Sequence, residues 1–133
     1  MDFVGSSTRC LWSQRHTFFM EKPSTIEYDA FSAVDMRIGV VVEVRAFPEA
    51  RKPAWQICVD FGSEFGRRWT SAQVTNYNEH ELVGRRVVGV INLGTRRIAG
   101  FESEFLLLGA VQPDGRVVLL DVDPSAELGS PIA

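Results

Sequence analysis

The feature that most constrains this fold is a change to a two-residue hydrophobic period at Met36. In the segment MRIGVVVEVRA, alternation places five apolar side chains on one face of an extended chain: Met36, Ile38, Val40, Val42 and Val44. Gly39 lies within this run, and we expect a β-bulge there. Alternating runs follow at residues 55–61, 67–74 and 85–93, and the apolar runs 105–111 and 116–122 are joined by a Pro-Asp-Gly turn. The pattern predicts a series of short antiparallel strands.

Two helical segments accompany these strands. Residues 24–35 carry apolar side chains at helical spacing behind Ser24 and Thr25 as N-caps, which predicts a short amphipathic helix. Residues 78–84, NEHELVG, allow one helical turn before the fourth strand. Five or six short strands with a small helix in this place are typical of a Greek-key barrel of the OB type. We therefore expect an all-β domain, a five-stranded OB-fold barrel with an N-terminal helix and a C-terminal extension.

The first 19 residues differ from the rest of the chain. Their sequence, MDFVGSSTRCLWSQRHTFF, has no structural period and lacks the basic start and apolar centre of a signal peptide. Met20 opens a segment typical of a domain start. We expect residues 20–133 to form one domain, and residues 1–19 to be a non-native leader from a misassigned start or a fusion. The alternative is a disordered native tail.

Charge is unevenly distributed along the chain. The net charge of −3 argues against a uniformly basic nucleic-acid binder. Residues 67–97 nevertheless hold six arginines and two glutamates, whereas residues 98–133 hold one arginine and six acids. This segregation permits a basic patch on an acidic protein.

The two C-terminal runs predict a partner subunit. The segments FLLLGAV and VVLL are apolar on both faces, whereas a lone antiparallel barrel needs only one dry face. A second covered surface is most simply supplied by another copy of the chain. We therefore expect a homodimer.

Residues able to support catalysis are scarce. His16 lies in the leader, and His80 lies on a polar turn between two glutamates. Cys58 falls within a strand and has no evident base for nucleophilic catalysis. No zinc-ligand spacing, Walker loop or dinucleotide-binding glycine motif occurs, so we predict a non-enzymatic protein with no cofactor and no metal. Only two cysteines and no long apolar run predict a cytoplasmic protein without membrane insertion.

Trp69 leads the binding candidates. In RRWTSAQV the core alternation directs Ala72 and Val74 inward, so Trp69, Ser71 and Gln73 share the outer face. An outward tryptophan beside small polar groups is typical of a stacking or peptide-contact platform. Burial of Trp69 beneath the helix or at a dimer seam is an equally weighted alternative.

Two other segments carry cations. The loop PEARKPAW is stiffened by its prolines and exposes Arg51 and Lys52 beside Pro53, as a rim for an anionic or acidic ligand or as an ordinary hairpin connection. Arg96 and Arg97 follow the fourth strand. Their guanidinium groups either grip a phosphate or carboxylate of a ligand or pair with Glu102 and Glu104.

Five blocks of this sequence, in this order along the chain, carry a family resemblance: VDMRIGVVVEV, FPEARKPAW, SAQV, LVGRRVVGVINL and ESEFLLLGA. Together they resemble the CsaA family of bacterial secretion chaperones, relatives of the tRNA-binding domain at the end of bacterial methionyl-tRNA synthetases. The resemblance covers about residues 26–132. It implies an OB-fold homodimer whose interface is built by the N-terminal helix and the C-terminal strands.

The resemblance also implies where a ligand binds. Family contact positions correspond here to the ARKPAW loop, to two residues of the third strand and to residues 92–104. Combined with the aromatic platform, they give these candidate peptide- or RNA-binding residues: Arg51, Lys52, Pro53, Trp69, Ser71, Gln73, Asn92, Arg96, Arg97, Ile98, Phe101, Ser103 and Glu104.

One segment departs from the family pattern. The usual N-F-P-P-R-Q-I-G-P-F-M-S-E reads NLGTRRIAGFESE in this chain. Gly94 and Thr95 replace a stiff Pro–Pro pair, and Glu102 replaces an apolar residue. We therefore expect a more flexible segment with an altered ligand preference.

Two functions are implied for one surface. The first is a chaperone that binds unfolded or export-bound polypeptides on apolar, partly basic grooves. The second is binding of tRNA or another structured RNA, with Lys52, Arg96 and Arg97 holding phosphates. A third interpretation is an accessory subunit that docks on an enzyme. The leader carries aromatic anchors and cations in CLWSQRHTFF, so we also expect it to occupy the groove of its own or a neighbouring molecule.

Overall fold

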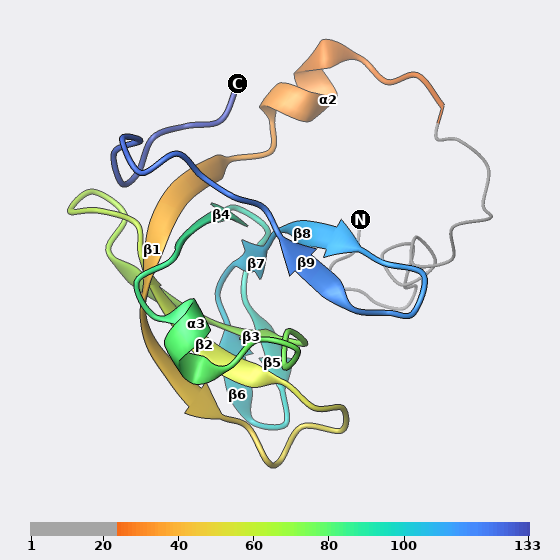
Figure 1. Ribbon diagram of the computed structural model, residues 1–133. Coiled ribbons are helices and arrows are strands. Elements are labelled where there is room, and N and C mark those ends of the chain that lie inside the picture. The colour runs from red at the N-terminus through yellow and green to blue at the C-terminus, as the bar shows by residue number, and fades with distance from the viewer. Residues whose placement is uncertain (1–23) are drawn as a thin grey trace.

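The computed structural model describes residues 24–133 as nine strands and two short helices (Figure 1). The strands are β1 (Met36–Ala46), β2 (Trp55–Asp60), β3 (Arg67–Ala72), β4 (Arg86–Val90), β5 (Arg96–Ile98), β6 (Phe101–Ser103), β7 (Leu106–Leu107), β8 (Gly109–Val111) and β9 (Val117–Leu119). The helices are α2 (Tyr28–Ser32) and α3 (Glu79–Leu82). The expectations for residues 1–19, for a start at Met20 and for a leader in the groove concern residues outside the described part.

The central sheet is a nearly closed antiparallel barrel. Its five strands follow the order β3-β2-β1-β4-β7, with β1 in the middle (Figure 1). Two bonds draw its outer strands together, because the Glu104 N–H donates to the Trp69 carbonyl and the Thr70 hydroxyl donates to the Phe105 carbonyl, each at 2.7 Å. The predicted five-stranded barrel is confirmed.

The bulge in β1 lies three residues beyond its predicted position. Val41 pairs with Val59 and Glu43 pairs with Cys58, so Val42 is the extra residue. The bulge shifts the alternation of buried and exposed side chains along β1. The predicted apolar face that included Val40 and Val42 is therefore wrong. Val41 is buried, as are Ile38 and Val44, whereas Val40 and Val42 are half-buried. The prediction for Gly39 is also wrong, because the pairing with β4 runs through it without a shift. A Cβ at Gly39 would lie 2.9 Å from the Phe61 ring, so close packing requires the glycine.

The C-terminal runs form more elements than predicted. The apolar run 105–111 is split into β7 and β8 at Leu108, whose N–H donates to the Val88 carbonyl at 3.0 Å. The Pro-Asp-Gly turn joins β8 to β9 as expected. The C-terminal extension then returns along the start of β1, where Gly129 N–H donates to the Ile38 carbonyl at 2.7 Å.

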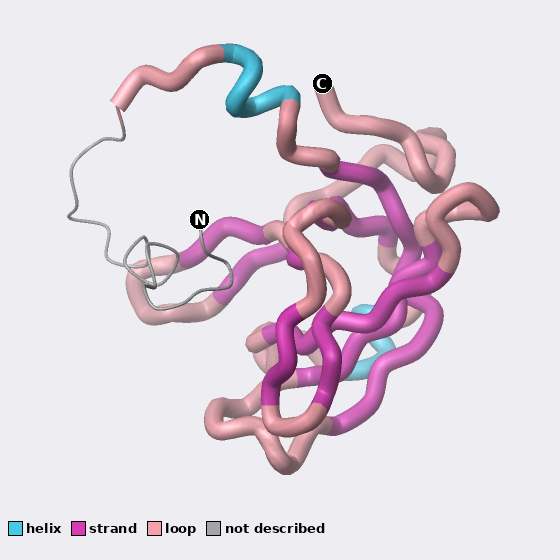
Figure 2. The backbone as a smooth tube through the Cα atoms, turned by 180° about the vertical axis from the view of Figure 1, so that it is seen from behind, coloured by secondary structure: helices cyan, strands magenta, loops and turns pink. Residues whose placement is uncertain are grey.

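The two helices have different environments. α3 precedes β4 as predicted, and its Leu82 is fully buried in the core. The predicted N-terminal helix is confirmed as α2, although Glu27 is its N-cap and makes no side-chain capping bond. α2 stands outside the barrel next to the C-terminus in both views (Figures 1 and 2), and none of its residues is buried. Its apolar side chains therefore face solvent in the single chain.

The barrel core is aliphatic around one aromatic pair. Phe61 and Phe105 are fully buried and meet edge to face with ring centroids 5.0 Å apart. Gly89 lies against both rings, where a Cβ would be 2.8 Å from each. Within residues 24–133, no helix combines the length and hydropathy needed to cross a membrane.

Candidate binding face

The strand register brings the predicted platform together with residues from β1 and β2. Trp69 pairs with Cys58, which pairs with Glu43, and the next row places Ser71, Gln56 and Arg45 side by side. Paired residues of antiparallel strands point to the same face of the sheet. We call these six residues the Trp69 face: Glu43, Arg45, Gln56, Cys58, Trp69 and Ser71.

An aromatic cluster lines this face. Trp69 meets Phe101 of β6 edge to face, with centroids 6.3 Å apart and an interplanar angle of 88°. Phe101 in turn contacts Phe47, at 5.4 Å and 58°. Phe47 is buried at the start of the loop that follows β1, whereas Trp69 and Phe101 remain half-buried. The sheet, the hairpin β5–β6 and the β1–β2 loop thus share one apolar patch.

Arg45 covers the ring of Trp69. Its guanidinium carbon lies 4.5 Å from the ring centroid, a cation–π geometry. Its Nε donates to Glu43 Oε2 at 2.7 Å, which neutralises the charge in place. Arg45 is not among the binding residues predicted from the sequence. Strand register explains its position: β1 and β3 both border β2, so long side chains on either strand can meet above β2.

Cys58 lies beneath this contact. Its position between Glu43 and Trp69 places it on the outward face, yet only 3% of the residue is exposed. Burial raises the pKa of its thiol above the usual 9.0, Arg67 opposes the shift, and three nearby carboxylates add to it. Cys58 is therefore a neutral, shielded thiol at neutral pH, in agreement with a structural role.

The charged connection between β4 and β7 forms the hairpin β5–β6. Ala99 and Gly100 make its turn with φ of 48° and 82°, the paired positive angles of a tight hairpin turn. Arg97 Nη1 donates to Glu102 Oε2 at 2.8 Å across the hairpin. Internal pairing thus accounts for Arg97 and Glu102. On the same strand, Arg96 is exposed and Ile98 is half-buried.

Ser103 and Glu104 attach the hairpin to β3. Glu104 Oε1 accepts a hydrogen bond from the Trp69 N–H at 2.8 Å, and Ser103 Oγ accepts one from the Ser71 N–H at 2.9 Å. Both side chains therefore satisfy backbone donors on the edge of β3. The two predicted contact residues hold the Trp69 face together.

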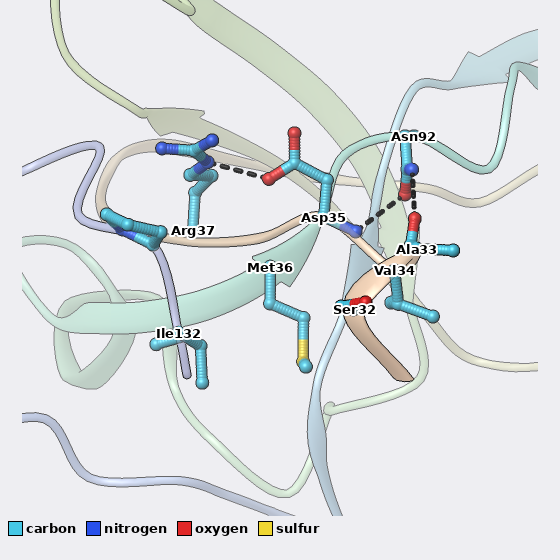
Figure 3. Close-up of a pocket in the computed structure, with 9 residues that line it drawn as sticks. Ser32, Ala33, Val34, Asp35, Met36, Arg37, Asn92 and Ile132 are labelled. Atoms are coloured by element: carbon cyan, nitrogen blue, oxygen red, sulfur yellow. Dashed lines mark hydrogen bonds and ion pairs between the residues drawn. The ribbon is translucent and has the colours of Figure 1, made fainter. Parts of the chain in front are cut away.

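Asn92 lies at the opposite end of β1 from Arg45. Its side-chain amide accepts from the Asp35 N–H at 2.9 Å and donates to the Ala33 carbonyl at 2.8 Å, which fixes the link between α2 and β1 (Figure 3). The surrounding depression of about 370 Å³ is lined by Asp35, Arg37 and Ile132, among others. The structure does not bring Asn92 together with the Trp69 face.

The remaining predicted residues are exposed in segments that continue from the strands of the face. Arg51, Lys52 and Pro53 are exposed in the loop that begins at Phe47, and Phe47 contacts Phe101. Gln73 is exposed just beyond the end of β3. Among residues 24–133, no group of three or more His, Cys, Asp or Glu side chains is arranged to hold a metal ion.

Comparison with known sequences identifies the family of this chain. The model described as "Putative tRNA binding domain" matches residues 36–131. Methionine–tRNA ligase of Methanococcus vannielii is 38% identical over 111 residues, which are 84% of this chain. The match spans only 16% of that enzyme's length.

Solved structures narrow the relationship. The CsaA chaperone protein of Picrophilus torridus is 43% identical with a TM-score of 0.78, and the match covers 82% of this chain and 100% of that one. Chaperone CsaA of Bacillus anthracis is 40% identical with a TM-score of 0.78, covering 83% and 100%. The chain belongs to the tRNA-binding-domain family, among its CsaA-type OB folds.

Proposed function

We propose that this protein is a non-enzymatic chaperone that binds extended polypeptide segments on the Trp69 face. The observation that carries the proposal is an aromatic surface flanked by two arginines that are paired with acids. Trp69 and Phe101 are half-exposed, and two arginines beside them form ion pairs, Arg45 with Glu43 and Arg97 with Glu102. A surface of this kind favours apolar side chains of a flexible chain over a polyanion.

The proposed assembly is a homodimer formed through α2. Ile26 and Tyr28 are 65% and 71% exposed, and Phe31 and Val34 add to the same apolar surface. Two of these side chains lie on α2 and two flank it, and four exposed large apolar side chains so close together are unusual on a monomer. Because polypeptides are captured before they cross a membrane, the proposed compartment is the cytoplasm, with export-bound chains as clients.

Calorimetric titration of the full chain with an unfolded, apolar-rich peptide tests the proposed function. Burial of one aromatic anchor against Trp69 contributes about 1.5–3 kcal/mol, so W69A should weaken binding about tenfold or more. L120A removes an exposed apolar side chain outside the face and serves as the matched control. Equal affinities for wild type and W69A would contradict the proposed site, and no peptide binding would contradict the function.

Binding of structured RNA is the second candidate function. The family match and the exposed Arg51, Lys52 and Arg67 around the face favour it. Phosphate contacts release counterions, so the logarithm of tRNA affinity should fall against the logarithm of salt concentration with a slope of about −0.7 to −0.9 per contact. Deacylated tRNA in the same titration at two salt concentrations distinguishes the candidates, because a flat salt response excludes phosphate-driven binding.

A further inference from the structure

The exposed surface above Trp69 is a guanidinium plane. Arg45 lies over the indole at 4.5 Å, and Phe101 stands against the indole edge at 6.3 Å. A ligand that approaches this side of Trp69 therefore meets Arg45 first. The Arg45 side chain is 59% exposed and has room for such a contact.

The contact spans the strand between its two partners. Arg45 and Trp69 lie on β1 and β3, separated by β2, about 10 Å apart at the backbone. Their side chains must lean toward each other over β2 to meet. Cys58 lies on this face of β2 and is 3% exposed, as expected for a residue under such an arch. The contact between Arg45 and Trp69 is thus part of the folded structure of this face.

Glu43 fixes the orientation of the guanidinium. It precedes Arg45 by two residues on the same face of β1 and accepts from Nε at 2.7 Å. This bond uses one edge of the guanidinium group and leaves both of its planar faces for stacking. The Glu43 carboxylate also partly offsets the positive charge, which lowers the attraction for a carboxylate or phosphate more than the attraction for an aromatic ring.

From this geometry we propose that Arg45 is the contact residue of an aromatic-selective subsite. An aromatic side chain of the polypeptide stacks on the outer face of the Arg45 guanidinium, and Trp69 supports the inner face. Glu43 is a positioning residue. The inference rests on the proposed polypeptide binding and deepens it, because it names the side-chain class that the face prefers.

The test compares host peptides that differ at one central position, Phe, Leu or Asp. Wild-type protein should bind the Phe peptide about three- to tenfold more tightly than the Leu peptide, the range expected for a partly exposed cation–π contact. R45K keeps the charge and loses the plane, and R45M keeps the stem and loses both. Each should abolish the Phe-over-Leu preference, and E43Q should reduce it.

Arg116 provides a matched control. It also pairs with an acid two residues earlier, Asp114 at 3.0 Å, and its side chain is 56% exposed, but it lies next to the β8–β9 turn. R116M should leave the Phe-over-Leu preference unchanged. Thermal unfolding of every variant verifies that the barrel is folded.

The outcomes separate the two proposals. A wild-type preference for Phe that survives in R45K overturns the stacking role of Arg45 and leaves polypeptide binding intact. A preference for the Asp peptide that R45K retains and R45M loses assigns Arg45 to simple charge recognition and also overturns the subsite. Binding of tRNA without binding of any peptide overturns the subsite and the proposed function together.

Discussion

At the scale of single residues, Cys58 links the packing of the Trp69 face to pH. The folded protein holds the thiol pKa above 9.0, chiefly by burial, so the folded state keeps a proton that the unfolded chain releases. The stability that this group contributes is complete below pH 9.0 and is lost as pH rises through the folded pKa.

The C58A variant tests this linkage. Urea unfolding of wild type and C58A should give stability curves that run parallel below pH 9.0, whereas above it the wild-type curve should fall more steeply. C58A should also unfold more readily at neutral pH, because it leaves a small cavity in the arch. Identical slopes above pH 9.0 would show that the thiol is not shielded in solution.

Residue types predicted some of the interactions around the Trp69 face but not others. Internal pairing of the arginines with Glu102 and Glu104 was one of two interpretations of the charged connection, and Arg97 does pair with Glu102. The other acid of that interpretation, Glu104, accepts a hydrogen bond from the backbone N–H of Trp69. Every non-proline residue offers that donor, so no side-chain pattern marks the partner.

At the scale of elements, the hairpin β5–β6 depends on its attachment to β3. E104A removes the acceptor of the Trp69 N–H and should lower the unfolding free energy by about 1–3 kcal/mol, the cost of an unsatisfied donor in a poorly hydrated place. E104Q keeps a carbonyl acceptor and should cost less. Hydrogen exchange followed by NMR should show faster exchange of the Trp69 amide in E104A.

Glu102 is the control for this attachment. Its ion pair with Arg97 is exposed on both sides, so E102A should cost at most about 1 kcal/mol. E102A should leave the exchange of the Trp69 amide unchanged. Equal effects of E104A and E102A would mean that the hairpin is held by charge and not by the bond to β3.

The segment that leads into this hairpin shows what the departure from the family pattern does to the backbone. Gly94 has a φ of 85°, a conformation that the proline ring forbids. The backbone here therefore follows a path that a Pro–Pro pair could not take at this position. The sequence shows that glycine replaces proline at this position. It does not show that the glycine adopts a positive φ, which changes the path of the backbone as well as its stiffness.

The displaced bulge in β1 has a similar cause. Alternation fixes which residues of a strand share a face only until an extra residue shifts the phase. Val40, Val41 and Val42 are identical side chains in a row, so no polar residue marks where the shift occurs. Gly39 was a natural candidate from composition, and it is explained by its contact with Phe61.

At the scale of the whole molecule, β1 separates two apolar surfaces. Its first residues adjoin α2 through the Asn92 bridge, and its last residues carry Arg45. The all-β barrel and the N-terminal helix were predictable because hydrophobic period marks them. The separation of the two apolar surfaces could not be predicted in this way, because it depends on the three-dimensional path of the chain across the barrel.

This arrangement predicts that assembly and ligand binding separate by mutation. The double variant Y28S/F31S removes the largest exposed apolar side chains of α2 and should convert the proposed dimer into a monomer in sedimentation equilibrium. Peptide affinity per chain should remain within about twofold of wild type, because the Trp69 face lies at the other end of β1.

The control replaces another exposed apolar residue, away from α2. Val83 is 45% exposed next to α3, and V83S should leave the sedimentation of the protein unchanged. A wild-type protein that sediments as a monomer at all concentrations would contradict assembly through α2. A monomeric Y28S/F31S variant that loses peptide binding would show instead that the ligand is held between two subunits, since the helix contributes no residue to the Trp69 face of its own chain.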